Sequence, residues 1–185
     1  MRRLPGAGTG ATVGSIIGAR MCMKSGVGTA SIRVMARGNV IVGAIVVVNA
    51  MGDVVDPHTG DVIAGARDPK TGKFIDTVKR MTSSGPRSEQ SATNTTIGVV
   101  ATNARLDKVG ATKVAQMAHD GLARAIRPVH TMSDGDTIFA LSTGSAAANL
   151  NVVGTAAAEV TAAAIVRAVR AAKSAVGIPG LASEE

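Results

Sequence analysis

Aromatic residues are almost absent from this sequence. It has no tryptophan, no tyrosine and only two phenylalanines, and its apolar residues, 45% of the chain, are mostly alanine, valine and isoleucine. Many nucleic-acid-binding proteins stack bases on aromatic rings, and the basic residues behind the net charge of +7 are scattered along the chain. We therefore expect no nucleic-acid partner. Small side chains favour helices and sheets in close contact, within a single domain of residues 1–185.

Disulfide, metal and cofactor patterns are also missing. Cys22 is the only cysteine, which excludes an internal disulfide and a cysteine metal cluster. The histidines show no metal-ligand spacing: we expect His58, in a turn, and His119, on a helix, to face solvent, and we favour a structural role for His130. The glycine-rich segment 6–11 lacks the preceding strand and the later acidic residue of a dinucleotide site. No cofactor and no metal are expected.

Signals for export or for membrane insertion are weak. The opening Met-Arg-Arg-Leu-Pro is followed by glycine and threonine, where a signal peptide has a long apolar stretch. No apolar run approaches the length that a bilayer requires. We expect a cytoplasmic protein with no membrane partner.

Runs of β-branched residues predict the strands. Residues 39–50 form a nearly continuous run of this kind, which is typical of a strand buried on both faces. Residues 29–35 alternate as in a strand, and residues 37–39 have the composition of a hairpin turn between the two. Two further strands are predicted at 95–103 and 136–142.

Two segments have helical spacing. Residues 106–127 are predicted as a helix with Asp107 as its cap and Pro128 at its end, and the alanine-rich residues 151–176 as another. Between residues 52 and 93 the sequence reads as a long irregular loop, and loops of this length are often functional. The order of elements predicts an α+β fold with helices and sheet in separate layers.

One junction differs from its surroundings: a polar loop leads directly into a β run at Asn94-Thr95-Thr96. Threonine is common in strands, so an ordinary strand start accounts for these residues as well. However, NTTIGVVATNA (94–104) resembles the cleavage-site segment of the L-aminopeptidase/D-esterase family, which includes the β-peptidyl aminopeptidases. Four more segments resemble those of that family in the same order: GAGTGATVG (6–14), GVGTAS (26–31), VVVNAMGDVVDPHTGDVIAGAR (46–67) and DGDTIFALSTG (134–144).

This resemblance implies a self-cleaving N-terminal-nucleophile hydrolase. The Thr95 hydroxyl would attack the carbonyl of Asn94, dividing the chain into an α portion, residues 1–94, and a β portion, residues 95–185. The new α-amine of Thr95, with an ordinary pKa of about 7.7–8.0, would then serve as the base.

The resemblance also implies roles for residues outside the cleavage site. Asn49 would donate its amide to the developing oxyanion, and Ser133 with Asp134 or Asp136 would orient the nucleophile and its amine. The alternatives are an asparagine that merely ends a strand and a simple turn before the next strand.

The implied activity is hydrolysis of N-terminal residues from small peptides, amides or esters through an acyl-enzyme on Thr95, in a homo-oligomer. Chains of the family carry a further N-terminal segment, which contributes strands to an αββα-type sandwich and an active-site tyrosine. Because this sequence contains no tyrosine, we expect an incomplete sandwich or a partner that supplies the missing segment. Two alternatives stay open: a non-catalytic homologue acting as a binding or assembly subunit, and an acyltransferase.

Overall fold

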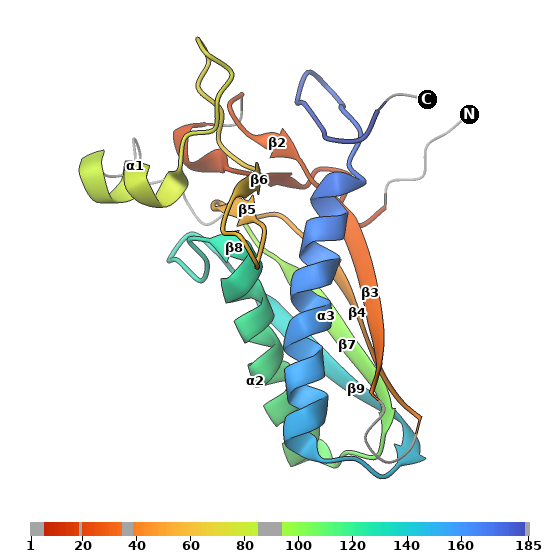
Figure 1. Cartoon of the computed structure of the whole chain (residues 1–185). Coiled ribbons are helices and arrows are strands. Elements are labelled where there is room, and N and C mark those ends of the chain that lie inside the picture. Colours follow the sequence, from red (N-terminus) through yellow and green to blue (C-terminus); the bar gives the residue numbers. More distant parts are fainter. Residues whose placement is uncertain (1–5, 19, 35–38, 85–93, 184–185) are drawn as a thin grey trace.

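The computed structural model describes residues 6–18, 20–34, 39–84 and 94–183. Its main unit is a four-stranded sheet of order β3-β4-β7-β9, formed by β3 (Val27–Val34), β4 (Val40–Val47), β7 (Ile97–Ala104) and β9 (Thr137–Ala146). β4 is antiparallel to both of its neighbours, and β7 and β9 run parallel. Helices α2 (Lys108–Ala125) and α3 (Leu150–Arg170) lie side by side on one face of this sheet (Figure 1). The predicted α+β class and the layering are confirmed.

α2 begins where the sequence predicts. The carboxylate of Asp107 accepts a hydrogen bond of 2.7 Å from the N–H of Gly110, which satisfies one free donor of the first turn. The helix ends at Ala125, because the chain becomes extended as β8 (Ile126–Arg127) before it reaches Pro128. The end is thus two residues earlier than the predicted end at residue 127.

Alanine and glycine allow α3 to pack very closely. A Cβ atom added to Gly28 on β3 would lie 2.6 Å from the backbone nitrogen of Ala168, and one added to Gly121 on α2 would run into the backbone carbonyl oxygen of Ala158. Both glycines are therefore required by backbone approach rather than by a turn. α3 is long and apolar enough to cross a bilayer, contrary to the sequence expectation, but 72% of its apolar window is buried inside the protein. Its buried apolar residues form part of the core.

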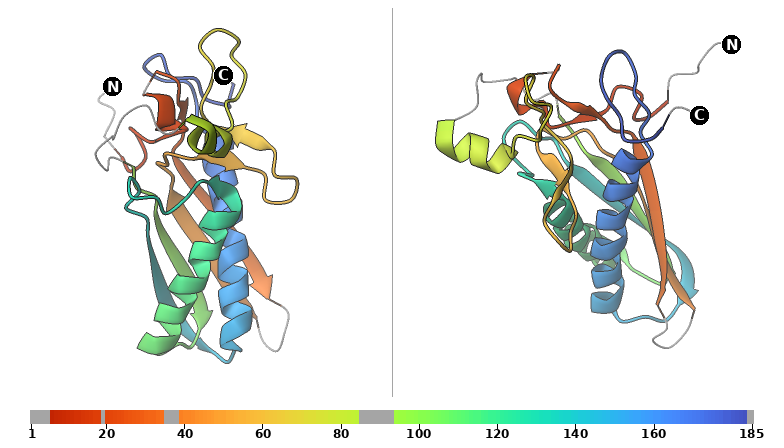
Figure 2. Two further views of the ribbon diagram at one scale, coloured as in Figure 1. Left: turned by 90° about the vertical axis from the view of Figure 1, so that its left-hand side faces the viewer. Right: turned by 45° about the horizontal axis from the view of Figure 1, so that its top comes forward.

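The two faces of the sheet differ in what covers them. On the inner face, under α2 and α3, Val42 is fully buried and Val46 is 1% exposed. On the outer face, Ile45 is 47% and Phe139 55% exposed, and Figure 2 shows no described element over it. The prediction that residues 39–50 are buried on both faces is wrong for the described structure: β4 alternates between buried and exposed side chains.

The prediction of a long irregular loop at 52–93 is wrong for residues 52–84, which contain regular structure. β5 (Asp53–Val55) and β6 (Val62–Ala64) form a small sheet with β8, and α1 spans Thr77–Ser84. The buried carboxylate of Asp53 accepts hydrogen bonds from the N–H groups of Ala66, at 2.9 Å, and Thr77, at 2.7 Å, while burial raises its pKa. Asp53 thereby fastens the start of α1 to the small sheet.

The remaining elements are short. β1 (Thr12–Val13) pairs with β2 (Met23–Lys24), and the single-turn helix η1 spans Ser15–Ile17. Residues 85–93, ahead of the predicted cleavage site, and most of the predicted hairpin turn at 37–39 lie outside the described residues.

Candidate active site at one end of the sheet

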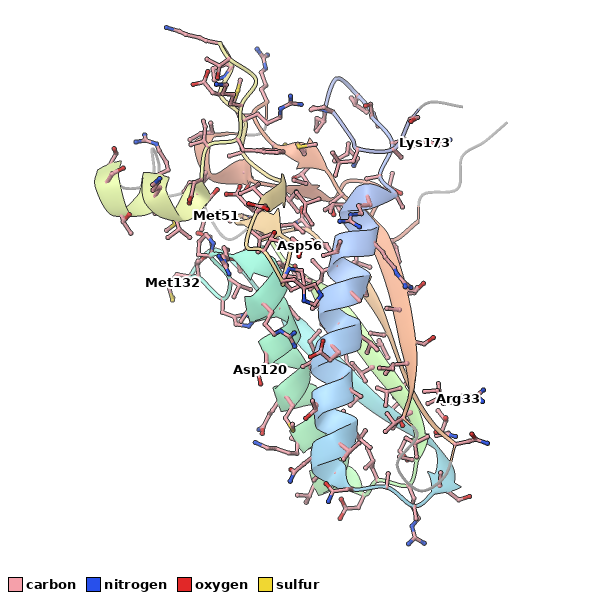
Figure 3. All side chains as sticks on the ribbon, viewed as in Figure 1. Arg33, Met51, Asp56, Asp120, Met132 and Lys173 are labelled. Atoms are coloured by element: carbon pink, nitrogen blue, oxygen red, sulfur yellow. The ribbon has the colours of Figure 1, made fainter. Side chains whose placement is uncertain are left out.

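Three loops meet at one end of the four-stranded sheet because of the direction in which its strands run. β4 ends at Val47, which pairs with Ile97 at the start of β7, and Ile97 pairs with Thr137 at the start of β9. The segments that follow β4 and precede β7 and β9 are therefore neighbours. Met51 and Met132 mark this end of the molecule (Figure 3). Each of the three segments carries predicted site residues.

The hydroxyl of Thr95 lies against the peptide bond that precedes it. Its Oγ1 donates a hydrogen bond of 2.6 Å to the carbonyl oxygen of Asn94, and that oxygen also accepts the N–H of Gly135 at 3.0 Å. The N–H of Thr95 donates to the carbonyl of Asn49 at 2.8 Å. The hydroxyl of Thr95 and the carbonyl of Asn94 are thus held together, with a backbone donor on the carbonyl oxygen.

Gly135 fits this position because it has no side chain. A Cβ atom there would lie 3.0 Å from Oγ1 of Thr95 and 3.9 Å from the carbonyl oxygen of Asn94. Gly135 was not predicted as a site residue, although its place between Asp134 and Asp136 in the segment SDGD offered a signal.

The side chain of Asn94 is buried, at 4% exposed. Its Oδ1 accepts a hydrogen bond of 3.1 Å from the hydroxyl of Ser15 on η1. Within the described structure its Nδ2 has no hydrogen-bond partner, and neither has the buried hydroxyl of Thr96. A buried polar group without a partner costs about 1–3 kcal/mol, so the residues on both sides of Thr95 each carry an unfavourable buried group.

Asn49 is fixed through both its side chain and its backbone. Oδ1 accepts the N–H of Thr12 at 3.1 Å, while the backbone carbonyl accepts the N–H of Thr95. The orientation of the amide is therefore set by β1, and Nδ2 is the donor group that the predicted oxyanion role requires.

Lys24 supports the same peptide unit from its other side and was not predicted. The Ala11–Thr12 peptide donates its N–H to Asn49, and its carbonyl oxygen accepts a hydrogen bond of 3.0 Å from Nζ of Lys24. Nζ also donates to the carbonyl of Thr9 at 2.9 Å. The side chain is 7% exposed, and burial lowers the pKa of its amine. Lys24 thus holds in place the peptide unit that orients the Asn49 amide.

The two predicted aspartates hold two different segments of the chain. Oδ2 of Asp134 accepts the hydroxyl of Thr131 at 2.6 Å, and its Oδ1 accepts the N–H of Met51 at 3.3 Å, just after Asn49. Asp136 accepts the N–H of Thr96 at 2.8 Å, just after Thr95. One carboxylate therefore fixes the loop after β4 and the other fixes the start of β7.

Ser133 is less closely connected to Thr95 than either aspartate. Its backbone N–H donates to the hydroxyl of Thr131 at 3.2 Å, and the structure shows no hydrogen bond from its own hydroxyl to a described residue. Its predicted role in orienting the nucleophile stays a prediction.

Two histidines extend the site. Nδ1 of His130 lies 2.8 Å from Oδ2 of Asp136, and its Nε2 lies 3.2 Å from Nδ1 of His119 on α2. His119 is half-buried, so the expectation that it simply faces solvent is wrong. Sequence spacing gave no sign of this contact, because β8 and the following turn bring the two residues together in space.

Comparison with known proteins assigns the chain to a family. The family model for Peptidase family S58 matches residues 4–182. The chain belongs to this family. Among its S58 relatives, an uncharacterized aminopeptidase of Mycobacterium leprae is 44% identical over 190 residues, covering 91% of this chain and 51% of that protein.

Solved structures agree with the assignment to S58. The beta-aminopeptidase of Burkholderia sp. is 25% identical with a TM-score of 0.60, covering 96% of this chain and 50% of that one. The L-aminopeptidase D-Ala-esterase/amidase of Ochrobactrum anthropi, at 21% identity and a TM-score of 0.62, covers 96% and 48% and supports the fold alone. The family resemblance seen in the sequence is confirmed, and this S58 chain spans about half the length of the relatives it matches.

Proposed function

We propose that this S58 chain is a self-processing N-terminal-nucleophile hydrolase whose nucleophile is Thr95. The observation that carries the proposal is the hydrogen bond of 2.6 Å between Oγ1 of Thr95 and the carbonyl oxygen of Asn94. The N–H of Gly135 on the same oxygen supports it, because a donor already in place stabilises negative charge as the charge develops.

In the proposed self-cleavage, Oγ1 of Thr95 forms a bond to the carbonyl carbon of Asn94. Negative charge moves to the carbonyl oxygen, facing Gly135, and then the C–N bond breaks. The hydroxyl proton ends on the leaving nitrogen, which leaves an ester on Thr95 and a free amine. Water hydrolyses the ester, giving a carboxylate at Asn94 and restoring the Thr95 hydroxyl.

The cleaved form would repeat this chemistry on a substrate. The new amine of Thr95 would accept the hydroxyl proton as the substrate is attacked, and Asn49 would donate its amide to the oxyanion. We propose small peptides, amides or esters with a free N-terminal residue as substrates, since the M. leprae relative and the Burkholderia enzyme carry aminopeptidase names. A cytoplasmic location completes the proposal.

Intact-mass spectrometry of the purified chain tests the nucleophile. The wild-type protein is expected to yield two polypeptides, residues 1–94 and 95–185, the second beginning Thr-Thr-Ile-Gly. Thr95→Ser keeps a hydroxyl and should still be cut, whereas Thr95→Ala should stay intact. Cleavage of the Thr95→Ala protein at the same bond would overturn the proposal.

We further propose that a second sheet covers the outer face, supplied by the part of the S58 fold that this chain does not span. The support is the row formed by Ile45, Val99 and Phe139, which are paired across neighbouring strands on that face. Where the outer face stays uncovered, copies of the chain can associate through it, so we also propose homo-oligomers. Ile45→Lys should shift the purified protein towards monomer in light scattering, while a monomeric wild type would contradict the proposed oligomer.

A further inference from the structure

Asp136 is a buried carboxylate with a histidine as its partner. Its side chain is 2% exposed, and its two oxygens have separate tasks: Oδ1 accepts the N–H of Thr96, and Oδ2 contacts Nδ1 of His130. A carboxylate taken out of water is costly to keep charged unless it is paired or hydrogen-bonded. The position of Oδ1, against the N–H of Thr96, therefore depends on His130, which holds Oδ2.

The backbone at His130 is held in an unusual conformation. Its φ is 56°, in the left-handed region, which costs a residue with a side chain about 1–2 kcal/mol. Such a conformation persists only where the surrounding structure maintains it. At His130 this conformation accompanies an imidazole ring that is 39% exposed and still contacts the carboxylate of Asp136.

His119 contacts the imidazole of His130 at the ring nitrogen that does not face Asp136. The two rings lie with their centroids 4.9 Å apart, and Nδ1 of His119 is 3.2 Å from Nε2 of His130. A continuous row of contacts thus runs from α2 through His119, His130 and Asp136 to the N–H of Thr96, one residue beyond Thr95.

We propose that His130 is a positioning residue for the reaction at Thr95. It fixes Asp136, which fixes the backbone of Thr96 and with it the start of β7, while His119 holds the ring in place. This inference rests on the proposed function. It assigns no contact with the reacting atoms to either histidine, so both act through Asp136.

The protonation of the histidine pair follows from its geometry. With His130 donating from Nδ1 to Asp136, its contact with His119 carries one shared hydrogen when the pair holds no charge or one charge. With two charges, both facing nitrogens carry hydrogens and the contact is lost. The charged groups acting on His119 are His130 and Asp136 from the site loops and Asp120 on α2, and burial and His130 lower the pKa of His119.

Four variants of the full chain test the proposal through the rate of self-cleavage, followed by intact mass after a pH jump. His130→Ala is expected to slow cleavage about tenfold or more, since small displacements of a reacting group have effects of this size. His130→Asn keeps a side-chain donor and should recover part of the rate. His119→Gln cannot titrate and should move the low-pH limb of the rate profile, which a purely structural role would leave in place.

His58→Ala is the matched control. His58 lies in the turn after β5 beside Glu159 and Arg170 of α3, and its removal should leave the rate unchanged. If His130→Ala fails to fold by circular dichroism, His130→Asn decides the question. Wild-type rates and an unchanged pH profile in both His130 variants would overturn this inference alone, whereas a wild type that never cleaves at Asn94–Thr95 would overturn the proposed function and this inference with it.

Discussion

The two faces of the four-stranded sheet carry similar residues in different surroundings. Neighbours on β4 illustrate this: Ile45 is 47% exposed and Val46 is 1% exposed, although both are β-branched. The inner face packs against α2 and α3 so closely that Gly28 leaves no room for a methyl group. The outer face meets no described element. We infer that the contribution of a side chain in this sheet to the free energy of unfolding depends more on what covers it than on its own hydrophobicity.

The largest effect is expected from filling the closest contact of the inner face. Gly28→Val would drive its side chain into the backbone of α3 at Ala164 and Ala168, and the helix would have to move off the sheet. We expect a loss of about 3 kcal/mol or more in the free energy of unfolding, measured by urea denaturation. An unchanged midpoint would show that the inner face is not close-packed.

A matched pair of truncations on β4 compares the two faces directly. Val46→Ala removes two carbons from a buried site and should cost about 2 kcal/mol. In protein dilute enough to be monomeric, Ile45→Ala removes three carbons but should cost less than about 1 kcal/mol, because its side chain is then half in solvent. If the two urea midpoints fell in the opposite order, the outer face would have to be covered in solution.

The smallest effect is expected from the protonation of His119 on α2. Burial and the neighbouring His130 lower the pKa of His119 from its ordinary value of 6.5, so the unfolded chain binds a proton there more readily than the folded one. The free energy of unfolding should therefore fall slightly as pH drops through about 6.5. His119→Gln should flatten this part of the pH–stability curve, and an equally steep curve in the variant would place the titration elsewhere.

The sequence was sufficient for the elements whose signals are local. β-branched runs predicted the strands of the main sheet, and Asp107 marked the start of α2 because capping involves residues three positions apart. The burial of β4 was over-predicted, since apolar composition does not reveal whether a second layer is present. The strands and helix within 52–93 were missed because they are short and held by distant partners such as Asp53.

The same distinction applies to the site. Thr95, Asn49 and the two aspartates were proposed as site residues through resemblance to family segments, and the structure brings these segments together at one end of the sheet. Lys24, Gly135 and the histidine pair could not, because their importance depends on contacts across the fold: a lysine against a peptide of β1, an N–H on a carbonyl 41 residues earlier, and rings from two separate elements.

The N–H of Gly135 has a consequence for the timing of activity. In the described structure this donor is occupied by the protein's own carbonyl at Asn94. If a substrate carbonyl takes the same place during the proposed reaction, the intact junction would block it. Under the proposed mechanism the chain is its own first substrate and, until it is cut, its own inhibitor. Folding would then act as the trigger, since only the folded sheet brings this donor to the bond that must break, and a newly made chain would stay inert until it had folded.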